Sequence, residues 1–209
     1  MTTAPTTGRR ELNKARTRES IVAAVRTLLE QHPVADITAD QVADEAGISR
    51  RTFFNYYSGI PAVLIEVLSG YAALLVERVS LEALREGPVE ALRALVRTGG
   101  LPPEFLDWLV ALNCHPHSGD GSVLIERAVW AQMGAWLEGV LHERLPEARD
   151  PLYVSTLASA VMHAFAATEQ TWLEQLADPC SPTADDYAAF HVHLDRALGY
   201  LAQGWRPTP

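Results

Sequence analysis

The sequence predicts an all-α protein, and three of its features support that prediction. Apolar residues recur three and four positions apart along most of the chain, which is the spacing of one face of an α-helix. No stretch alternates apolar and polar residues between hairpin turn signals, as a half-buried strand would. Glycine and proline divide the chain into segments of helix length, at sites such as Gly87-Pro88 and Pro102-Pro103. About nine helices fit these segments.

The helices are expected in the following order. The first covers residues 14–31, ends at His32-Pro33, and follows a polar segment, residues 1–13, that we expect to be disordered. Residues 113–121 are rich in Pro, Gly, Ser and Asp and are expected to form a loop. The other helices are expected at residues 39–46, 50–56, 60–85, 88–98, 103–112, 122–144, 152–177 and 184–203.

Residues 37–57, ITADQVADEAGISRRTFFNYY, predict two short helices joined by a tight turn. Thr38 and Ser49 are N-cap residue types, whose hydroxyls suit the first free amides of a helix. Gly47 supplies the left-handed or closely packed position that ends the first helix. One face of the second helix is apolar and the opposite face is polar, which is the layout of a helix-turn-helix motif.

This stretch resembles the DNA-binding signature of the TetR family of bacterial transcriptional regulators, and the resemblance covers residues 1–68 directly. One departure is Ile60, which stands where the family usually has a lysine that contacts a DNA phosphate. The positions that agree in residue type and spacing are Thr38, Val42, Ala43, Ala46, Gly47, Ser49, Thr52, Phe53, Tyr56 and Tyr57.

The resemblance implies two domains: a helix-turn-helix DNA-binding domain at residues 1–58, and a helical effector-binding and dimerisation domain at residues 59–209. It also implies a homodimer formed through the last two helices and bound to a pseudo-palindromic double-stranded operator. A small-molecule effector of unknown identity would then release the DNA. The expected function is therefore that of a ligand-released repressor; an activator, or a regulator without a ligand, stays an alternative.

Base contacts are expected from the second helix of the motif. Phe53 and Tyr57 face the core, whereas Arg51 and Asn55 point the other way and match guanine and adenine edges in the major groove. For any single side chain the alternative is a solvated position on a surface helix. The expected base contacts are Arg50, Arg51, Thr52 and Asn55. Hydroxyls, helix amino termini and the basic arm suit phosphate oxygens, and the expected phosphate contacts are Arg16, Thr17, Arg18, Thr38, Ser49 and Tyr56.

Charge is divided unevenly along the chain. The net charge of −9 argues at first against a nucleic-acid partner. Residues 1–58, however, hold eight basic and seven acidic residues, whereas residues 59–209 hold nine basic and nineteen acidic ones. An acidic body behind a basic arm discourages unspecific DNA binding and keeps the local attraction to phosphate.

The sequence predicts the effector pocket less clearly than it predicts the DNA-binding motif. Large apolar residues of the middle helices are candidate wall residues, although ordinary core packing is the favoured explanation for each one. Glu169 follows a long uncharged run and would favour a cationic or amine-bearing ligand if it faces a cavity; a solvated helix position is the favoured alternative. The expected pocket residues are Trp108, Trp130, Met133, Trp136, Met162, Phe165, Glu169 and Trp172.

A rival hypothesis from another class concerns the loop that holds Cys114, His115 and His117. These residues, with Asp120, are potential metal ligands, and an all-α metal-binding protein or enzyme is the alternative function. No second ligand cluster has a known spacing, and no P-loop, nucleophile-elbow or dinucleotide motif is present. We therefore expect neither catalysis, nor a cofactor, nor a metal.

Cellular location is inferred from cysteine content and the amino terminus. Cys114 and Cys180 are far apart in sequence and predict no disulfide framework. The amino terminus is polar and basic, unlike a signal peptide. The uncharged run at residues 151–168 predicts a buried helix, because a membrane span needs about 20 mostly apolar residues. A cytoplasmic protein without a membrane partner is the expectation.

Overall fold

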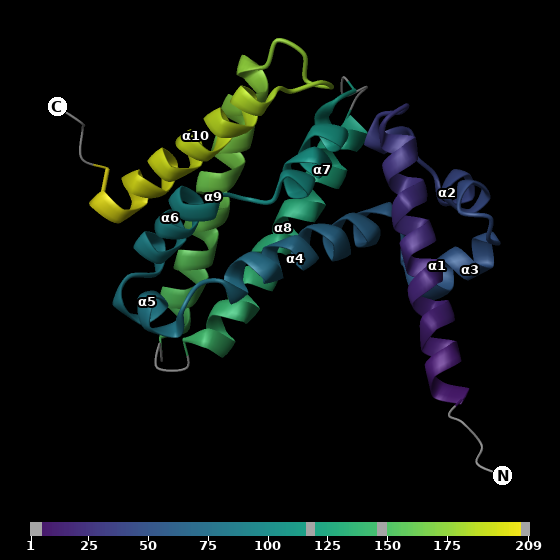
Figure 1. The fold of residues 1–209 in the computed structure, drawn as a ribbon, viewed down its shortest axis with the longest axis horizontal. Helices are drawn as coiled ribbons and strands as arrows, with labels where there is room; N and C mark the ends of the chain where they lie inside the picture. The colour runs from purple at the N-terminus through teal and green to yellow at the C-terminus, as the bar shows by residue number, and fades with distance from the viewer. Residues whose placement is uncertain (1–5, 116–119, 146–149, 206–209) are drawn as a thin grey trace.

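The computed structural model describes residues 6–115, 120–145 and 150–205 (Figure 1). Within these ranges the chain forms ten α-helices and one short 3-10 helix, and no strand, so the all-α prediction is confirmed. The elements are α1 (Thr6–Leu29), η1 (Val34–Asp36), α2 (Ala39–Glu45), α3 (Arg50–Tyr56), α4 (Ile60–Glu77), α5 (Leu81–Glu86), α6 (Pro88–Gly99), α7 (Pro103–Asn113), α8 (Asp120–Arg144), α9 (Pro151–Gln175) and α10 (Ala184–Gln203).

Two helix boundaries differ from the prediction. Residues 6–13 were expected to be disordered but belong to α1, because good helix formers such as Arg10, Glu11 and Leu12 continue the first helix upstream. The single helix expected at residues 60–85 is divided into α4 and α5. Ser80 causes this division, since its side chain accepts a hydrogen bond from the backbone amide of Ala83 at 3.1 Å and so caps α5.

Helices α1 to α3 pack together at one end of the molecule (Figure 1), and we call them the head. Ile21 and Val25 of α1, Val42 of α2 and Phe53 of α3 are fully buried together. Ile21 and Val25 are four positions apart in α1 and so lie on one face of it, and α2 and α3 each add a buried side chain to the shared core. The packing fixes the angle at which α3 is presented to solvent.

Helices α4 to α10 form the body, and α4 leads from the head into it (Figure 1). Helix α9 packs against both α8 and α10, while α6 packs on α10 and α4 packs on α8. Among the described helices, only α4 is long and apolar enough to span a membrane by length and composition. Its residues Val63, Leu64 and Leu68 are fully buried against the rest of the protein, which accounts for part of this apolar content, whereas Leu74 is 58% exposed.

Helix α7 joins the head to the far side of the body. Arg26 of α1 donates a hydrogen bond to the carbonyl oxygen of Asp107 at 2.5 Å, and its guanidinium lies 5.4 Å from the ring centre of Trp108. The Asp107 carboxylate accepts a hydrogen bond from the Tyr187 hydroxyl of α10 at 2.5 Å. Burial and this carboxylate together raise the pKa of Tyr187 to about 12, so the hydroxyl stays protonated.

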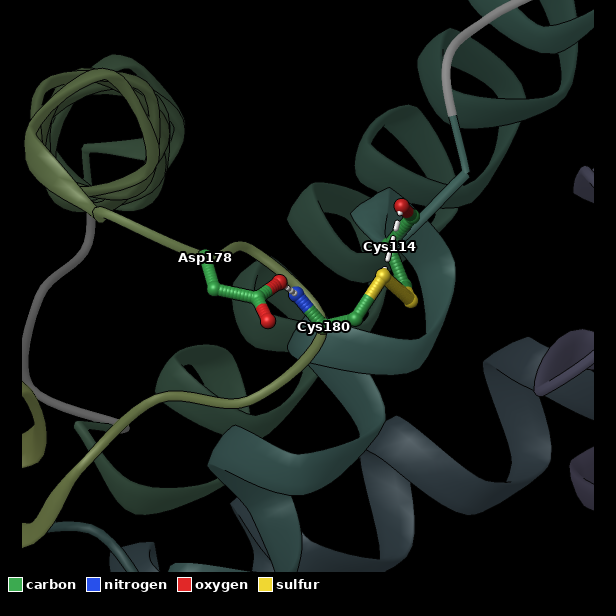
Figure 2. Close-up of a disulfide and its surroundings, with 3 residues drawn as sticks. All are labelled: Cys114, Asp178 and Cys180. Carbon is green, nitrogen blue, oxygen red and sulfur yellow. Dashed lines mark hydrogen bonds between the residues drawn. A yellow bond between two sulfur atoms is a disulfide. The ribbon is translucent and has the colours of Figure 1, made fainter.

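A disulfide joins Cys114, at the end of α7, to Cys180 in the connection between α9 and α10 (Figure 2). The expectation that these cysteines stay unpaired is wrong, because the fold brings residues that are 66 positions apart to a Cα–Cα distance of 4.5 Å. Asp178 helps to shape this connection by accepting a hydrogen bond from the Cys180 amide at 2.9 Å. The disulfide therefore ties α7 to the last helical pair.

Candidate nucleic-acid interface and ligand cavity

The two short helices of the head are capped by their own sequence. The Thr38 side chain accepts a hydrogen bond from the Gln41 amide at 3.3 Å, and Gln41 returns one by accepting from the Thr38 amide at 2.8 Å. The Ser49 hydroxyl accepts from the Thr52 amide at 3.0 Å and so caps α3. Gly47 has a φ of +65°, a left-handed conformation that glycine adopts without strain. Local sequence alone thus sets the turn that orients α3.

Helix α3 divides into a buried and an exposed face. Phe53 is fully buried and Tyr57, directly after the helix, is 4% exposed, whereas Arg51 and Asn55 are exposed. Phe54 is 46% exposed beside them. Of the four predicted base contacts, Arg51 and Asn55 therefore lie exposed on the outer face, whereas Thr52 is half-buried and its hydroxyl lies 2.8 Å from that of Ser49.

Arg50 is less free than Arg51. Its guanidinium forms an ion pair with Asp40 of α2 at 2.8 Å and lies 5.5 Å from the ring centre of Phe54. Arg51 makes no ion pair with any residue that the structure describes. A base contact by Arg50 would require it to leave Asp40, so Arg51 is the stronger candidate of the two.

A cleft between α1 and α3 joins basic and hydrogen-bonding side chains. Its lining residues are Arg10, Glu11, Asn13, Lys14 and Thr17 of α1 and Asn55 and Tyr56 of α3, so one acidic side chain lies among the basic ones. The basic arm is predicted to attract phosphate, but Arg10, Asn13 and Lys14 are not among the residues named for that contact. The signal was present in the sequence: Arg10, Lys14 and Thr17 follow helical spacing.

The predicted phosphate contacts on α1 differ in their surroundings, and of these only Thr17 lines the cleft. Arg16 is exposed, and the Thr17 hydroxyl donates to the Asn13 carbonyl oxygen at 2.9 Å. Arg18 lies 3.6 Å from the carboxylate of Glu66 on α4, in an exposed pair of small energetic weight. Glu66 also accepts a hydrogen bond from the Tyr57 hydroxyl at 2.9 Å, and burial together with this contact raises the pKa of Tyr57. Arg18 therefore lies beside Glu66 of α4 and also faces solvent.

The body holds an apolar cavity of about 120 Å³. It lies between α4, α6, α8, α9 and α10, and every described residue that lines it is apolar. The rings of Trp130 and Phe165 meet in its wall with centroids 5.2 Å apart. The expected pocket residues that line it are Trp130, Met133, Trp136, Met162 and Phe165.

A second, smaller cavity lies beside Glu169, and we call it the Glu169 chamber. It measures about 20 Å³ and is lined by Val34, Leu64, Leu112, Asn113, Ile125, Glu126, Val129, Trp130 and Glu169. Glu169 is only 5% exposed, and its Oε1 accepts a hydrogen bond from the Asn113 side chain at 3.3 Å. Burial, reinforced by the charge of Glu126, raises the pKa of Glu169 to about 8, so the carboxyl is protonated at neutral pH.

The head matches a known family at the level of sequence. Residues 21–67 match the family described as bacterial regulatory proteins, tetR family. This range begins inside α1 and ends inside α4, and so contains the whole helix-turn-helix described above. Residues 21–67 therefore carry the DNA-binding domain of the TetR family. The prediction made from residues 37–57 is thereby confirmed.

Curated relatives and one solved structure extend this result. The chain is 38% identical over 81 residues to the HTH-type transcriptional regulator EthR of Mycobacterium tuberculosis and to that of Mycobacterium bovis. This match spans 38% of the chain and 37% of those regulators, which is less than two thirds of their length. The crystal structure of Thermus thermophilus FadR, a TetR family repressor solved with lauroyl-CoA, covers 92% of the chain with a TM-score of 0.50 and 23% identity. At that identity the similarity shows a shared TetR fold.

The departure from the TetR pattern at Ile60 has a structural basis. Ile60 is 6% exposed and lies in the same apolar cluster as Phe53 and Tyr57. The start of α4 therefore contributes packing to the head at the position where the family usually places a lysine. A phosphate contact from this side chain is lost.

Two of the expected pocket residues lie outside both cavities. Trp108 is 6% exposed and packs under the guanidinium of Arg26. Trp172 is 1% exposed, and its indole N–H donates to the carbonyl oxygen of Asp186 at 2.7 Å. Both side chains are core residues that hold helices together, which is the alternative that sequence alone left open.

The metal-binding alternative loses its principal ligand. Cys114 is bonded to Cys180, so it has no free thiolate to offer a metal. Among the described residues, no three His, Cys, Asp or Glu side chains are grouped as metal ligands would be, and His117 lies outside those residues. His115 is described, and its Nε2 is buried without a hydrogen bond. The disulfide thus replaces the metal site as the interpretation of this loop.

Proposed function

We propose that the protein is a sequence-specific DNA-binding transcriptional regulator, acting in the cytoplasm as a homodimer on a pseudo-palindromic operator and released by an apolar ligand. The observation that carries the DNA-binding part is the unpaired, exposed Arg51 beside Asn55 on a capped α3 within a TetR head. Arg51 would read guanine, and Asn55 would read adenine. Arg10 and Lys14 would hold the neighbouring phosphates.

The outer face of α9 supports the dimer. Its exposed positions Tyr153, Ser159, His163 and Ala167 carry no fixed charge, and no Asp, Glu, Lys or Arg occurs in residues 151–168. On the neighbouring α10, Val192 is 65% exposed. An uncharged surface of this length suits a helix-to-helix contact with a second copy, in which α9 and α10 of each copy form a four-helix bundle.

The position of the apolar cavity supports the proposed release by a ligand. Ala72, Leu75 and Val76 of α4 line it, and the same helix begins with Ile60 inside the core of the head. A ligand that widens the cavity would displace α4 and change the separation of the two heads. Such coupling requires different affinities for the two states, typically worth about 1–3 kcal/mol.

A selection experiment tests this function. Full-length protein is used to enrich duplexes from a random DNA library, and the enriched sequence is titrated by fluorescence anisotropy at several salt concentrations. We expect an enriched palindromic site whose affinity falls steeply with salt, and a complex of two chains per site. Retention of all library sequences alike, or of none, would exclude a sequence-specific regulator.

A further inference from the structure

The Glu169 chamber holds a carboxyl group whose hydrogen bonding is incomplete. Its Oε1 accepts one hydrogen bond, from Asn113 at 3.3 Å, and no described residue donates to Oε2. The side chain is nevertheless 95% removed from solvent, since only 5% of Glu169 is exposed. Buried carboxyl groups are normally paired or fully hydrogen-bonded, so this one has unused capacity to accept.

The walls of the chamber favour a positive charge. Glu126 of α8 lines it together with Glu169, and so does Trp130, whose ring face attracts cations. No Lys or Arg is among its described lining residues. Its volume of about 20 Å³ is close to that of one bound water, which is also the size of a primary ammonium group.

Trp130 also lines the apolar cavity, so the chamber and the cavity share a wall. We propose that the two together bind an amphiphilic primary amine, with its ammonium group in the Glu169 chamber and its apolar part in the cavity. This deepens the proposed function, on which it rests, by naming the class of ligand. The carboxylate of Glu169 receives the ammonium hydrogen bonds, and Trp130 stacks on the carbon that bears the nitrogen.

The ammonium group enters in exchange for a proton. In the empty chamber Glu169 is a neutral carboxylic acid; when the ammonium ion binds, the carboxyl O–H bond breaks and the proton leaves to solvent. The other titratable groups that face the chamber and the groove outside it are Glu126 of α8 and His163 and Glu174 of α9, while α7 contributes only the amide of Asn113. About one proton is therefore released for each amine bound near neutral pH.

The chamber also reaches the head. Val34, from the 3-10 helix between α1 and α2, forms part of its wall and is 4% exposed. The amino-terminal half of α8, which carries Glu126, packs on this 3-10 helix. A ligand that draws Glu126 and Glu169 together would shift α8 against Val34, and this gives the ammonium group a direct route to the DNA-reading helices.

Isothermal titration calorimetry on the full-length protein tests the proposal with octylamine, octanol and octyltrimethylammonium. We expect octylamine to bind roughly tenfold or more tightly than octanol, because a charge-assisted hydrogen bond is added. Octyltrimethylammonium should lose this advantage, because its head group exceeds the chamber. Repeating the titration in buffers of different ionisation enthalpy should show about one proton released per octylamine.

Two variants complete the test. Glu169→Gln keeps the shape of the protonated side chain, and we expect it to remain folded, to bind octylamine no better than octanol, and to release no proton. Glu174→Gln removes a carboxylate from the outer groove but not from the chamber, and should behave as the unchanged protein. Equal binding of octylamine and octanol by the unchanged protein, absence of octylamine binding, or a preference that survives in Glu169→Gln would each overturn the proposal.

The same ligands separate this proposal from the proposed function. DNA affinity is measured by anisotropy with and without each ligand. If octylamine binds through Glu169 but leaves DNA affinity unchanged, the proposed amine site is supported and the proposed release of DNA by a ligand is refuted. If octanol and octylamine lower DNA affinity equally, release by a ligand is supported and the amine site is refuted.

Discussion

The head and the body of this protein are held together by contacts of different range along the chain. In the head, the caps at Thr38 and Ser49 and the turn at Gly47 are satisfied by residues at most five positions away. In the body, Arg93 of α6 is paired with Asp195 of α10 at 3.1 Å, across 102 positions. Contacts between residues close in sequence can be predicted from the sequence, whereas the pairing of residues far apart in sequence is determined by the fold.

The largest expected effect concerns the core of the head. Phe53→Ala removes a fully buried ring that contacts Phe54 and Tyr57, and should lower the free energy of unfolding of the head by about 3–5 kcal/mol. We expect DNA binding to be lost together with part of the helical circular dichroism signal. The matched control is Phe54→Ala, next to it and 46% exposed, which should change stability by no more than about 0.5 kcal/mol. Equal effects of the two variants would contradict the assignment of faces on α3.

The body offers a matching test at its disulfide. Cys180→Ser opens a loop of 66 residues and should lower the free energy of unfolding by about 2–4 kcal/mol, because the unfolded chain gains freedom. Urea unfolding with and without reductant measures this. Reductant should lower the free energy of unfolding of the unchanged protein to that of the variant, and should not change the free energy of unfolding of the variant. A reductant effect of the same size on both proteins would show that the disulfide carries no stability.

The contrast between head and body also explains which predictions succeeded. The capped turn, Phe53 and Tyr57 were predictable because each follows from residue type and helical spacing within residues 37–57. The disulfide was missed because no local pattern links Cys114 to Cys180. Likewise, Trp130 and Trp172 look alike in sequence, and only the packing of α8, α9 and α10 puts the first at a cavity and the second in the core. For Glu169, the sequence predicted a preference for a cationic ligand only if the side chain faces a cavity, and only the fold determines whether it does.

Within the head, Arg51 should set the preference for one base position, beside Asn55 at another. Arg51→Ala should leave folding unchanged and lower affinity for the selected operator by about 1–3 kcal/mol, with preference relaxed at one base position per half-site. Repeating the library selection with the variant measures this change in base preference directly. Arg50→Ala is the comparison, since Arg50 is already paired with Asp40 at 2.8 Å and should have the smaller effect on base preference. A larger effect for Arg50→Ala would mean that this ion pair opens on DNA.

Phosphate binding by the amino-terminal half of α1 should have a different signature. Lys14→Ala removes one cation from the cleft that also contains Asn55, and should weaken binding to all sequences alike. The slope of log affinity against log salt should fall by about 1, with the selected sequence unchanged. An altered base preference would place Lys14 at a base edge instead of a phosphate.

The smallest expected effect returns to long-range pairing in the body. His191 of α10 accepts a hydrogen bond from the Leu101 amide at Nε2, at 2.9 Å, and Gly100, with a φ of +62°, leaves room for the ring to approach. Burial lowers the pKa of His191 below its ordinary value, so the folded protein keeps the ring neutral while the unfolded chain binds a proton. This contribution to stability is complete above about pH 6.5, the ordinary histidine value, and is lost as pH falls below it.

Thermal unfolding should therefore show a melting temperature that declines between neutral and mildly acidic pH. His191→Gln should reduce this decline, whereas His163→Gln, at an exposed position on α9, should leave it unchanged. An identical decline in all three proteins would show that other groups control the acid sensitivity of the body.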